Sequence, residues 1–126
     1  MIVSDADTAI ALHSGDVAVL GTPRLVALCE EAACAAVLST LPEGQTTVGN
    51  GIQFNHLSPT PVGAHVAAEA TLERIEGRRL SFTVSARDSA GLVGAGRISR
   101  VVVDRDRFLA KVRPGSTSAG KQPPGR

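Results

Sequence analysis

The chain has 126 residues, of which 43% are hydrophobic and 20% are charged, and this size and composition are typical of one folded domain. Its 13 basic and 12 acidic residues give a formal net charge of +1, which argues against nucleic acid or an anionic membrane surface as a partner. Aromatic residues make up only 2% of the chain, which disfavours modules that bind RNA or single-stranded DNA by stacking bases on exposed rings.

The first clearly patterned segment predicts a helix over residues 23–41. Thr22 is suited to the N-cap, and Pro23 is suited to the first helical position, where its missing N–H has no cost. Apolar residues then recur at helical spacing, and Pro42 and Gly44 end the pattern. The apolar stripe consists of Leu25, Leu28, Cys29, Ala32, Ala33, Ala36 and Val37.

The chain after residue 45 is typical of β-strands, which we expect over residues 46–56, 64–75, 79–87 and 92–112. The third of these alternates apolar and polar residues throughout, as a half-buried antiparallel strand does. The last is expected to bend, because its apolar positions change parity between Gly96 and Val101.

A short strand, one long helix and a four-stranded meander together predict an α+β domain over residues 1–113. An antiparallel sheet would wrap around the single long central helix. Such a sheet has unpaired edge strands that a second copy can cover, so we expect a homodimer, or a tetramer, built through a continuous sheet. Residues 114–126 contain three Pro and three Gly and are predicted to form a disordered tail.

Two cysteines, Cys29 and Cys34, lie in the predicted helix. Their spacing would point the side chains about 140° apart around the helix axis, which is unsuited to a disulfide. No apolar stretch approaches the roughly 18 residues of a membrane span, and the acidic N-terminus is unlike a signal peptide. We therefore expect a cytoplasmic protein with reduced thiols, no membrane partner and no metal site.

Three segments carry a resemblance to a known family: LGTPRLVALCEEAACAAV at 20–37, TTVGNGIQFNHLSPTPVG at 46–63, and IEGRRLSFTVSARDSAGLVGAGRISRVVV at 75–103. In this order and spacing the chain resembles the hotdog-fold thioesterase superfamily, and within it the fluoroacetyl-CoA thioesterase-like branch. The resemblance implies a hotdog fold and an enzyme that hydrolyses an acyl-CoA thioester to a carboxylate and free coenzyme A. We expect this reaction to need no cofactor.

The same resemblance implies a catalytic set of Thr22 at the helix start, Glu30 eight residues later, and His56 on the following strand. It also implies that the backbone at Gly49 lines the site and that Arg100 on the last strand takes part in substrate binding. Thioester hydrolysis needs an activated water or nucleophile, and a carboxylate or an imidazole can act as the base.

The residues alone leave other roles open for this set. Glu30 and the adjacent Glu31 could be two solvated helix charges, although they lie on different flanks of the helix. Thr22 could be a helix cap only. His56 shares strand parity with apolar residues and could be a structural, hydrogen-bonded histidine.

The run Gly49-Asn50-Gly51 marks a flexible point in the strand over 46–56. It fits a β-bulge, and it also fits a place where the backbone packs along the pantetheine arm, with a hydrogen bond from Asn50. Arg100 belongs to a group of six basic residues in 97–113. These could bind the phosphates of coenzyme A, or they could be solvated charges on an edge strand.

The segment at 13–21, HSGDVAVLG, contains no aromatic ring, whereas fluoroacetyl-CoA thioesterase shields its small acyl group with aromatic residues before the helix. We therefore expect a general acyl-CoA thioesterase. A hotdog hydratase is disfavoured, because the chain has no Asp-x-Asn-Pro-x-His segment. The alternative is a dimer that binds acyl-CoA, or another small ligand, without cleaving it.

Overall fold

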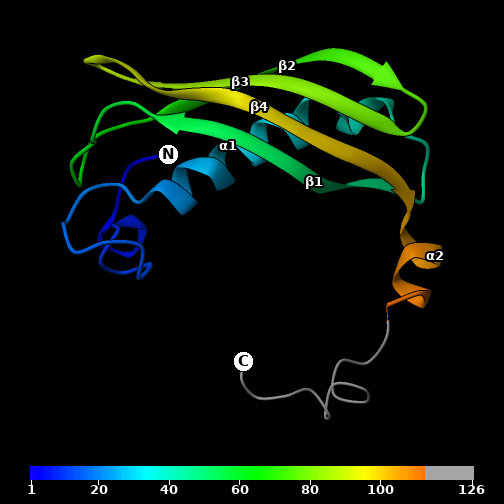
Figure 1. Cartoon of the computed structure of the whole chain (residues 1–126), viewed down its shortest axis with the longest axis horizontal. Helices are drawn as coiled ribbons and strands as arrows, with labels where there is room; N and C mark the ends of the chain where they lie inside the picture. Colours follow the sequence, from blue (N-terminus) through cyan, green and yellow to red (C-terminus); the bar gives the residue numbers. More distant parts are fainter. Residues whose placement is uncertain (113–126) are drawn as a thin grey trace.

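A computed structural model describes residues 1–112, and the predicted tail at 114–126 lies outside this range. Figure 1 shows an antiparallel sheet curved over one long helix, with a short helix after the last strand. This arrangement confirms the predicted α+β domain with a sheet wrapped around a central helix. The elements are α1 (Thr22–Val37), β1 (Gln45–His56), β2 (Ala67–Glu76), β3 (Arg79–Asp88), β4 (Gly91–Asp104) and α2 (Arg105–Ala110), with 3₁₀ turns at Asp5–Asp7 and Leu38–Thr40.

Helix α1 matches the prediction in its body but not at its cap. A 3₁₀ turn extends it to Thr40, close to the predicted end at residue 41. The N-cap is Gly21 rather than Thr22, and Thr22 is the first helical residue. Glycine fits this position because a Cβ at Gly21 would come within 2.9 Å of the Leu12 side chain. The Thr22 hydroxyl is therefore not needed as a cap.

The buried face of α1 holds the helix against the concave side of the sheet. Leu25, Cys29, Ala33 and Val37 recur every four residues, and none exposes more than 4% of its surface. They belong to the same core cluster as Phe82 of β3, which is 1% exposed. The small Cys and Ala side chains let the sheet approach the helix closely.

The strand order is β1-β4-β3-β2, which places β1 and β2 at the two edges. Strands β2, β3 and β4 follow one another as predicted, but β1 pairs with β4 instead of β2, so the four-stranded meander is wrong at β1. A hydrophobic pattern predicts that a strand exists and which face it buries, but backbone hydrogen bonds are available to any neighbour. Strand β1 has a partner on only one side within residues 1–112.

The predicted last strand over 92–112 is wrong in its final third. Strand β4 ends at Asp104, whose carboxylate accepts the Arg107 N–H at 3.1 Å and caps α2. This local bond turns the chain into a helix where apolar residues alone suggested a longer strand. Between Gly96 and Val101, β4 pairs with β3 without a register shift, and the shifts in its two ladders lie in β1 beside Asn50 and at Val93 of β4. The predicted bend stays a prediction.

The predicted short N-terminal strand is wrong, because the described N-terminal residues form only isolated bridges, such as the one between Ile2 and His65. The segment after them forms a loop at the start of α1, held by a bond from the Gly21 N–H to the Asp7 carbonyl at 2.8 Å. Neither helix within residues 1–112 combines the length and the apolar character that a membrane span requires.

We expect Cys29 to be unreactive in the folded protein. It is fully buried, and this burial raises the pKa of its thiol to about 11. At pH 8 about one Cys29 in a thousand would then be a thiolate, the form that reacts. In a Cys34→Ser variant, where Cys29 is the remaining thiol, a thiol reagent should label the protein in denaturant but not in buffer. Rapid labelling of this variant in buffer would contradict the buried position.

Candidate active site

Thr22 and His56 come together at one end of the sheet, although they lie 34 residues apart in sequence. The Thr22 Oγ1 and His56 Nδ1 atoms are 2.7 Å apart, which is a hydrogen bond whose donor depends on the tautomer of the ring. Thr22 is exposed in the first turn of α1, and His56 is the last residue of β1. The interpretation of Thr22 as only a helix cap is therefore wrong.

The other ring nitrogen of His56 is enclosed and lacks a partner. Nε2 has essentially no contact with solvent, and no residue within 1–112 hydrogen-bonds to it. A buried polar atom without a partner costs about 1–3 kcal/mol, so such atoms are rare in folded proteins. A buried ring nitrogen without a partner is more typical of a functional histidine than of a structural one.

A recess of about 360 Å³ opens over the pair. Its walls come from the N-terminal loop and from the turn that follows β1. Apart from the His56 imidazole, no aromatic side chain from residues 1–112 lines it. The lining consists of Ala9, Ser14, Gly15, Asp16, Val17, Val19, Leu20, Thr22, His56, Leu57, Ser58 and Pro59.

Glu30 and its neighbour Glu31 have different environments, as the sequence predicted. The Glu30 side chain is 33% exposed and places Oε2 3.1 Å from Nη1 of Arg100. The Glu31 side chain is 63% exposed and forms a longer contact of 3.4 Å with Arg24 on the helix surface. Only Glu30 faces the sheet.

Arg100 lies inside the fold rather than on its surface, with 8% of its area exposed. Its Nε donates to Thr47 Oγ1 at 2.8 Å, its Nη2 donates to the Thr47 carbonyl at 3.0 Å, and its Nη1 donates to Glu30. The role of Arg100 in substrate binding stays a prediction. The sequence analysis missed Thr47, because a threonine inside a β-branched strand gives no signal of what its hydroxyl contacts.

The run Gly49-Asn50-Gly51 forms a β-bulge, where the pairing of β1 with β4 shifts register. A Cβ at Gly49 would lie 2.9 Å from Glu30 Oε2, so glycine leaves room for the carboxylate. Asn50 points to the other face of the sheet, where its Oδ1 accepts a bond from the Ser99 hydroxyl at 2.6 Å. A Cβ at Gly51 would also meet the Ser99 hydroxyl, so of the three residues Gly49 is the one beside Glu30.

The bulge also determines where His56 points. Before the bulge, the odd-numbered residues Thr47 and Gly49 pair with inward residues of β4. After the bulge, the even-numbered residues of β1 face inward, and these are Ile52, Phe54 and His56. One extra residue shifts the alternation by one position. Both Gly49 and His56 therefore face the helix side of the sheet.

Within one chain, Glu30 does not meet the Thr22–His56 pair. The two helix residues are eight positions apart, which is about 12 Å along the axis of α1. Glu30 and Arg100 open instead onto a separate recess of about 530 Å³, with Ala27, Cys34 and Leu38 among its walls. The predicted catalytic set is thus divided between two recesses in a single chain.

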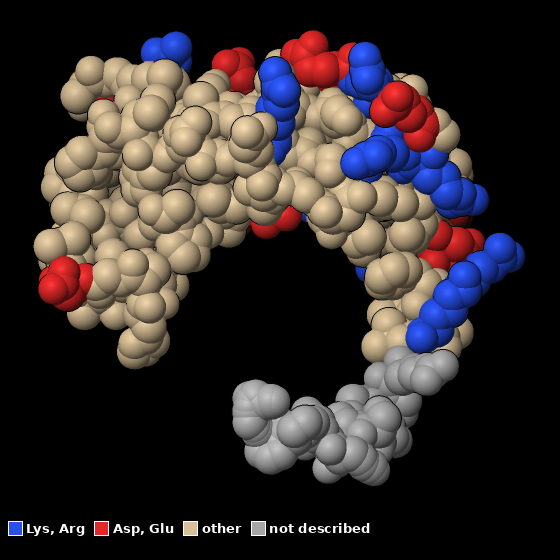
Figure 2. Space-filling model, in the orientation of Figure 1, with Lys and Arg blue, Asp and Glu red and all other residues tan. Residues whose placement is uncertain are grey.

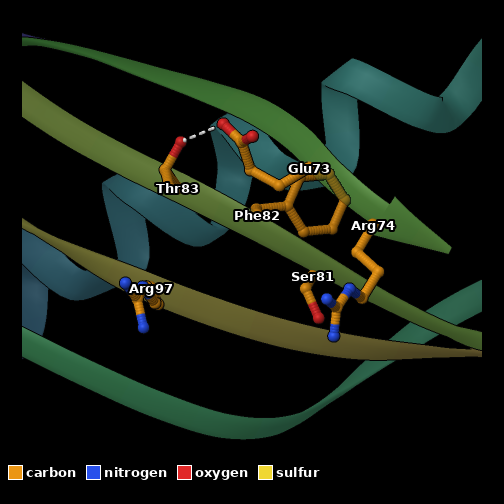
Figure 3. A pocket seen from close by; sticks show the side chains of 6 residues that line it. All are labelled: Glu73, Arg74, Ser81, Phe82, Thr83 and Arg97. Carbon is orange, nitrogen blue, oxygen red and sulfur yellow. Dashed lines mark hydrogen bonds between the residues drawn. The ribbon is translucent and has the colours of Figure 1, made fainter. Parts of the chain in front are cut away.

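A further hollow of about 510 Å³ lies away from both recesses, over strands β2, β3 and β4. Figure 3 shows its lining, in which the Thr83 hydroxyl bonds to Glu73 at 2.9 Å. None of the predicted site residues belongs to it. Its walls are formed by Glu73, Arg74, Ser81, Phe82, Thr83 and Arg97.

The sequence and the fold are similar to those of known thioesterases. Residues 3–106 match the family described as fluoroacetyl-CoA-specific thioesterase. The fluoroacetyl-CoA thioesterase of Streptantibioticus cattleyicolor is 39% identical over 102 residues, which cover 81% of this chain and 73% of the relative.

Solved structures agree with this similarity. A crystal structure of a point variant of the fluoroacetyl-CoA-specific thioesterase FlK superposes with a TM-score of 0.85 at 34% identity, covering 90% of this chain and 88% of the other. A hot-dog-like protein from Thermanaerovibrio acidaminovorans superposes with a TM-score of 0.79 at 26% identity, covering 100% of this chain and 88% of the other. The predicted hotdog fold is confirmed.

We expect Glu30 and Glu31 to contribute unequally to stability. A Glu30→Ala variant should lose about 1–3 kcal/mol of unfolding free energy, because the buried Arg100 guanidinium loses its carboxylate partner. The matched Glu31→Ala variant should change by less than about 0.5 kcal/mol, because it removes an exposed pair. Urea unfolding of both variants measures the difference, and equal losses would contradict a special environment for Glu30.

Proposed function

The chain belongs to the fluoroacetyl-CoA-specific thioesterase family and is a thioester hydrolase, and from this premise we propose that it hydrolyses acyl-CoA to a carboxylate and free coenzyme A. The observation that carries the proposal is the hydrogen bond between Thr22 and His56 in the lining of an open recess. A hydroxyl paired with an imidazole can be activated as a nucleophile, or can hold an attacking water.

In the proposed reaction, an oxygen from water or from Thr22 attacks the thioester carbonyl, and His56 takes the proton that this oxygen loses. The C–S bond then breaks, and the leaving thiolate of coenzyme A takes the proton back from His56. If Thr22 is the nucleophile, water hydrolyses the acyl-threonine in a second step. The developing oxyanion would lie near the start of α1, where the helix dipole is positive.

Glu30 would complete this site from a second copy of the chain. Edge strand β1 can pair with β1 of a partner in antiparallel fashion around a two-fold axis. With the axis at Gln53, Ile52 lies opposite Phe54 of the other copy, and because Asn50 is the extra residue of the bulge, Gly49 of one copy then lies opposite His56 of the other. Directly opposite residues point to the same face. Because Glu30 sits against Gly49, its carboxylate would lie beside the Thr22–His56 pair of the partner.

The surface around β1 supports such a homodimer. Figure 2 shows that the charged side chains in this view gather mainly on the convex side and toward α2, while the concave side is mostly uncharged. Ile52 on β1 and Leu38 beyond α1 are 49% and 72% exposed, which is apolar surface that a partner would cover. Further pairing of dimers would give the predicted tetramer.

The proposed substrate is a general acyl-CoA rather than fluoroacetyl-CoA, because the Thr22–His56 recess has no ring besides the imidazole to enclose a small acyl group. Of the residues predicted to bind substrate, Gly49 has its backbone beside Glu30, and Arg100 lines the same recess as Glu30. Both cysteines are free, which supports the proposed cytoplasmic location.

Thiol release from a panel of thioesters tests the activity. Acetyl-, hexanoyl-, phenylacetyl- and fluoroacetyl-CoA would be offered to the purified protein, with fluoroacetyl-CoA expected not to be preferred. His56→Ala and Glu30→Gln should each slow release about a hundredfold, because each removes a group that moves or holds a proton. Glu31→Gln is the matched control and should match the wild type. Binding of acyl-CoA without thiol release would favour the non-catalytic alternative.

Mixing two inactive variants tests whether the site is shared between copies. A dimer of one Glu30→Gln chain and one His56→Ala chain would contain one intact site, made of Glu30 from one copy and His56 from the other. After random exchange of equal amounts, we expect about a quarter of the wild-type activity. Mixing His56→Ala with a chain that carries both substitutions should restore nothing. Failure of the first mixture to recover, once exchange is demonstrated by mass, would overturn the shared site.

A further inference from the structure

We propose that Thr47 and Arg100 act together as positioning residues that hold the Glu30 carboxylate in place for the reaction. This inference rests on the proposed function and assigns a role to Thr47, a residue that touches neither recess. Its basis is a continuous chain of hydrogen bonds from β1 through β4 to α1.

Thr47 accepts two hydrogen bonds from the guanidinium of Arg100. Its hydroxyl accepts from Nε at 2.8 Å, and its carbonyl accepts from Nη2 at 3.0 Å. Because the guanidinium is planar, two contacts on one side fix the direction of the remaining donors. Both residues are buried, with 9% of Thr47 and 8% of Arg100 exposed, so water does not compete for these bonds.

The fixed guanidinium in turn holds one oxygen of Glu30. Nη1 donates to Oε2 at 3.1 Å, while Oε1 has no hydrogen-bond partner among residues 1–112. The absence of a side chain at Gly49 lets the carboxylate occupy this place. Glu30 is thus anchored through Oε2 and lines the recess with Oε1 left free to act as a base or to hold a water.

Stability alone is a poor explanation for this arrangement. The inward neighbours of Arg100 on β4 are Ile98 and Val102, and Ile98 is 1% exposed. A buried ion pair is often no more stabilising than apolar residues of similar size, because both charges lose their hydration. An arginine in this apolar row, held by two bonds to Thr47 and aimed at one carboxylate, is better explained by the need to place that carboxylate.

Two substitutions at Thr47 separate positioning from packing. Thr47→Val keeps the shape of the side chain and removes the hydroxyl, so Nε of Arg100 loses its partner. Thr47→Ser keeps the hydroxyl. We expect Thr47→Val to lower kcat about tenfold or more with little change in KM, because a displaced carboxylate impairs the reaction rather than binding. Thr47→Ser should stay within about twofold of the wild type.

The effect should also depend on Glu30. In a Glu30→Gln background, Thr47→Val should lower kcat no further, because the carboxylate that it positions is already gone. If Thr47→Val fails to fold, Arg100→Lys tests the positioning role in its place. The lysine ammonium keeps the charge but cannot make the two hydrogen bonds with Thr47. Arg100→Lys should lower kcat by a similar factor.

The possible outcomes distinguish this inference from the proposed function. If Glu30→Gln is inactive while folded Thr47→Val, or Arg100→Lys in its place, keeps the wild-type kcat, the positioning role is wrong and the thioesterase activity stands. If Thr47→Val lowers kcat by the same factor with and without the Glu30→Gln substitution, its effect is structural and the positioning role is also overturned. If the wild-type protein releases no thiol from any thioester, the proposed function fails and the inference fails with it.

Discussion

The ion pair between Glu30 and Arg100 is the interaction that ties the helix of this fold to its sheet at the candidate site. Most of the contact between α1 and the sheet is apolar and therefore non-directional, so it sets the distance of the helix but not the direction of any polar group. The guanidinium adds a directional contact at 3.1 Å between the central strand β4 and the middle of α1. Because a buried guanidinium needs all of its partners, Thr47 and Glu30 are constrained together.

A second constraint comes from the bulge at Asn50. Strand β1 must present Thr47 to Arg100 at one end and His56 to Thr22 at the other, and both side chains must lie on the helix side of the sheet. Strict alternation would put an odd-numbered and an even-numbered residue on opposite faces. The extra residue in the ladder removes this conflict. Of the two glycines beside Asn50, Gly49 leaves space for the Glu30 carboxylate and Gly51 leaves space for the Ser99 hydroxyl.

The sequence predicted the parts of this molecule that depend on local pattern. The body of α1, the alternation of β3, the inward direction of His56 and the difference between Glu30 and Glu31 all follow from helical or strand periodicity. Strand order did not follow, because periodicity does not specify which edge a strand joins. The end of β4 was missed because one capping bond at Asp104 outweighed a run of apolar residues.

The site was predictable only as a set of residue types. The resemblance named Thr22, Glu30 and His56, but it could not say that the first and last would bond at 2.7 Å while Glu30 turned to Arg100. Thr47 could not be found from sequence, since its importance lies in a contact 53 residues away along the chain. Non-local polar contacts of this kind depend on register, which the hydrophobic pattern of a half-exposed edge strand specifies weakly.

In the proposed dimer, the division of the predicted catalytic set between two recesses would give the open edge of β1 a function. An exposed strand edge is a liability, because its free N–H and C=O groups invite pairing with any other strand. In this fold the same edge carries His56 at one end and lies beside Glu30 at the other. A two-fold pairing of β1 would cover the edge, and it would also bring His56 of each copy beside Glu30 of the other. Correct register would then be a condition for activity, because a slip of one residue would turn His56 to the face opposite Glu30.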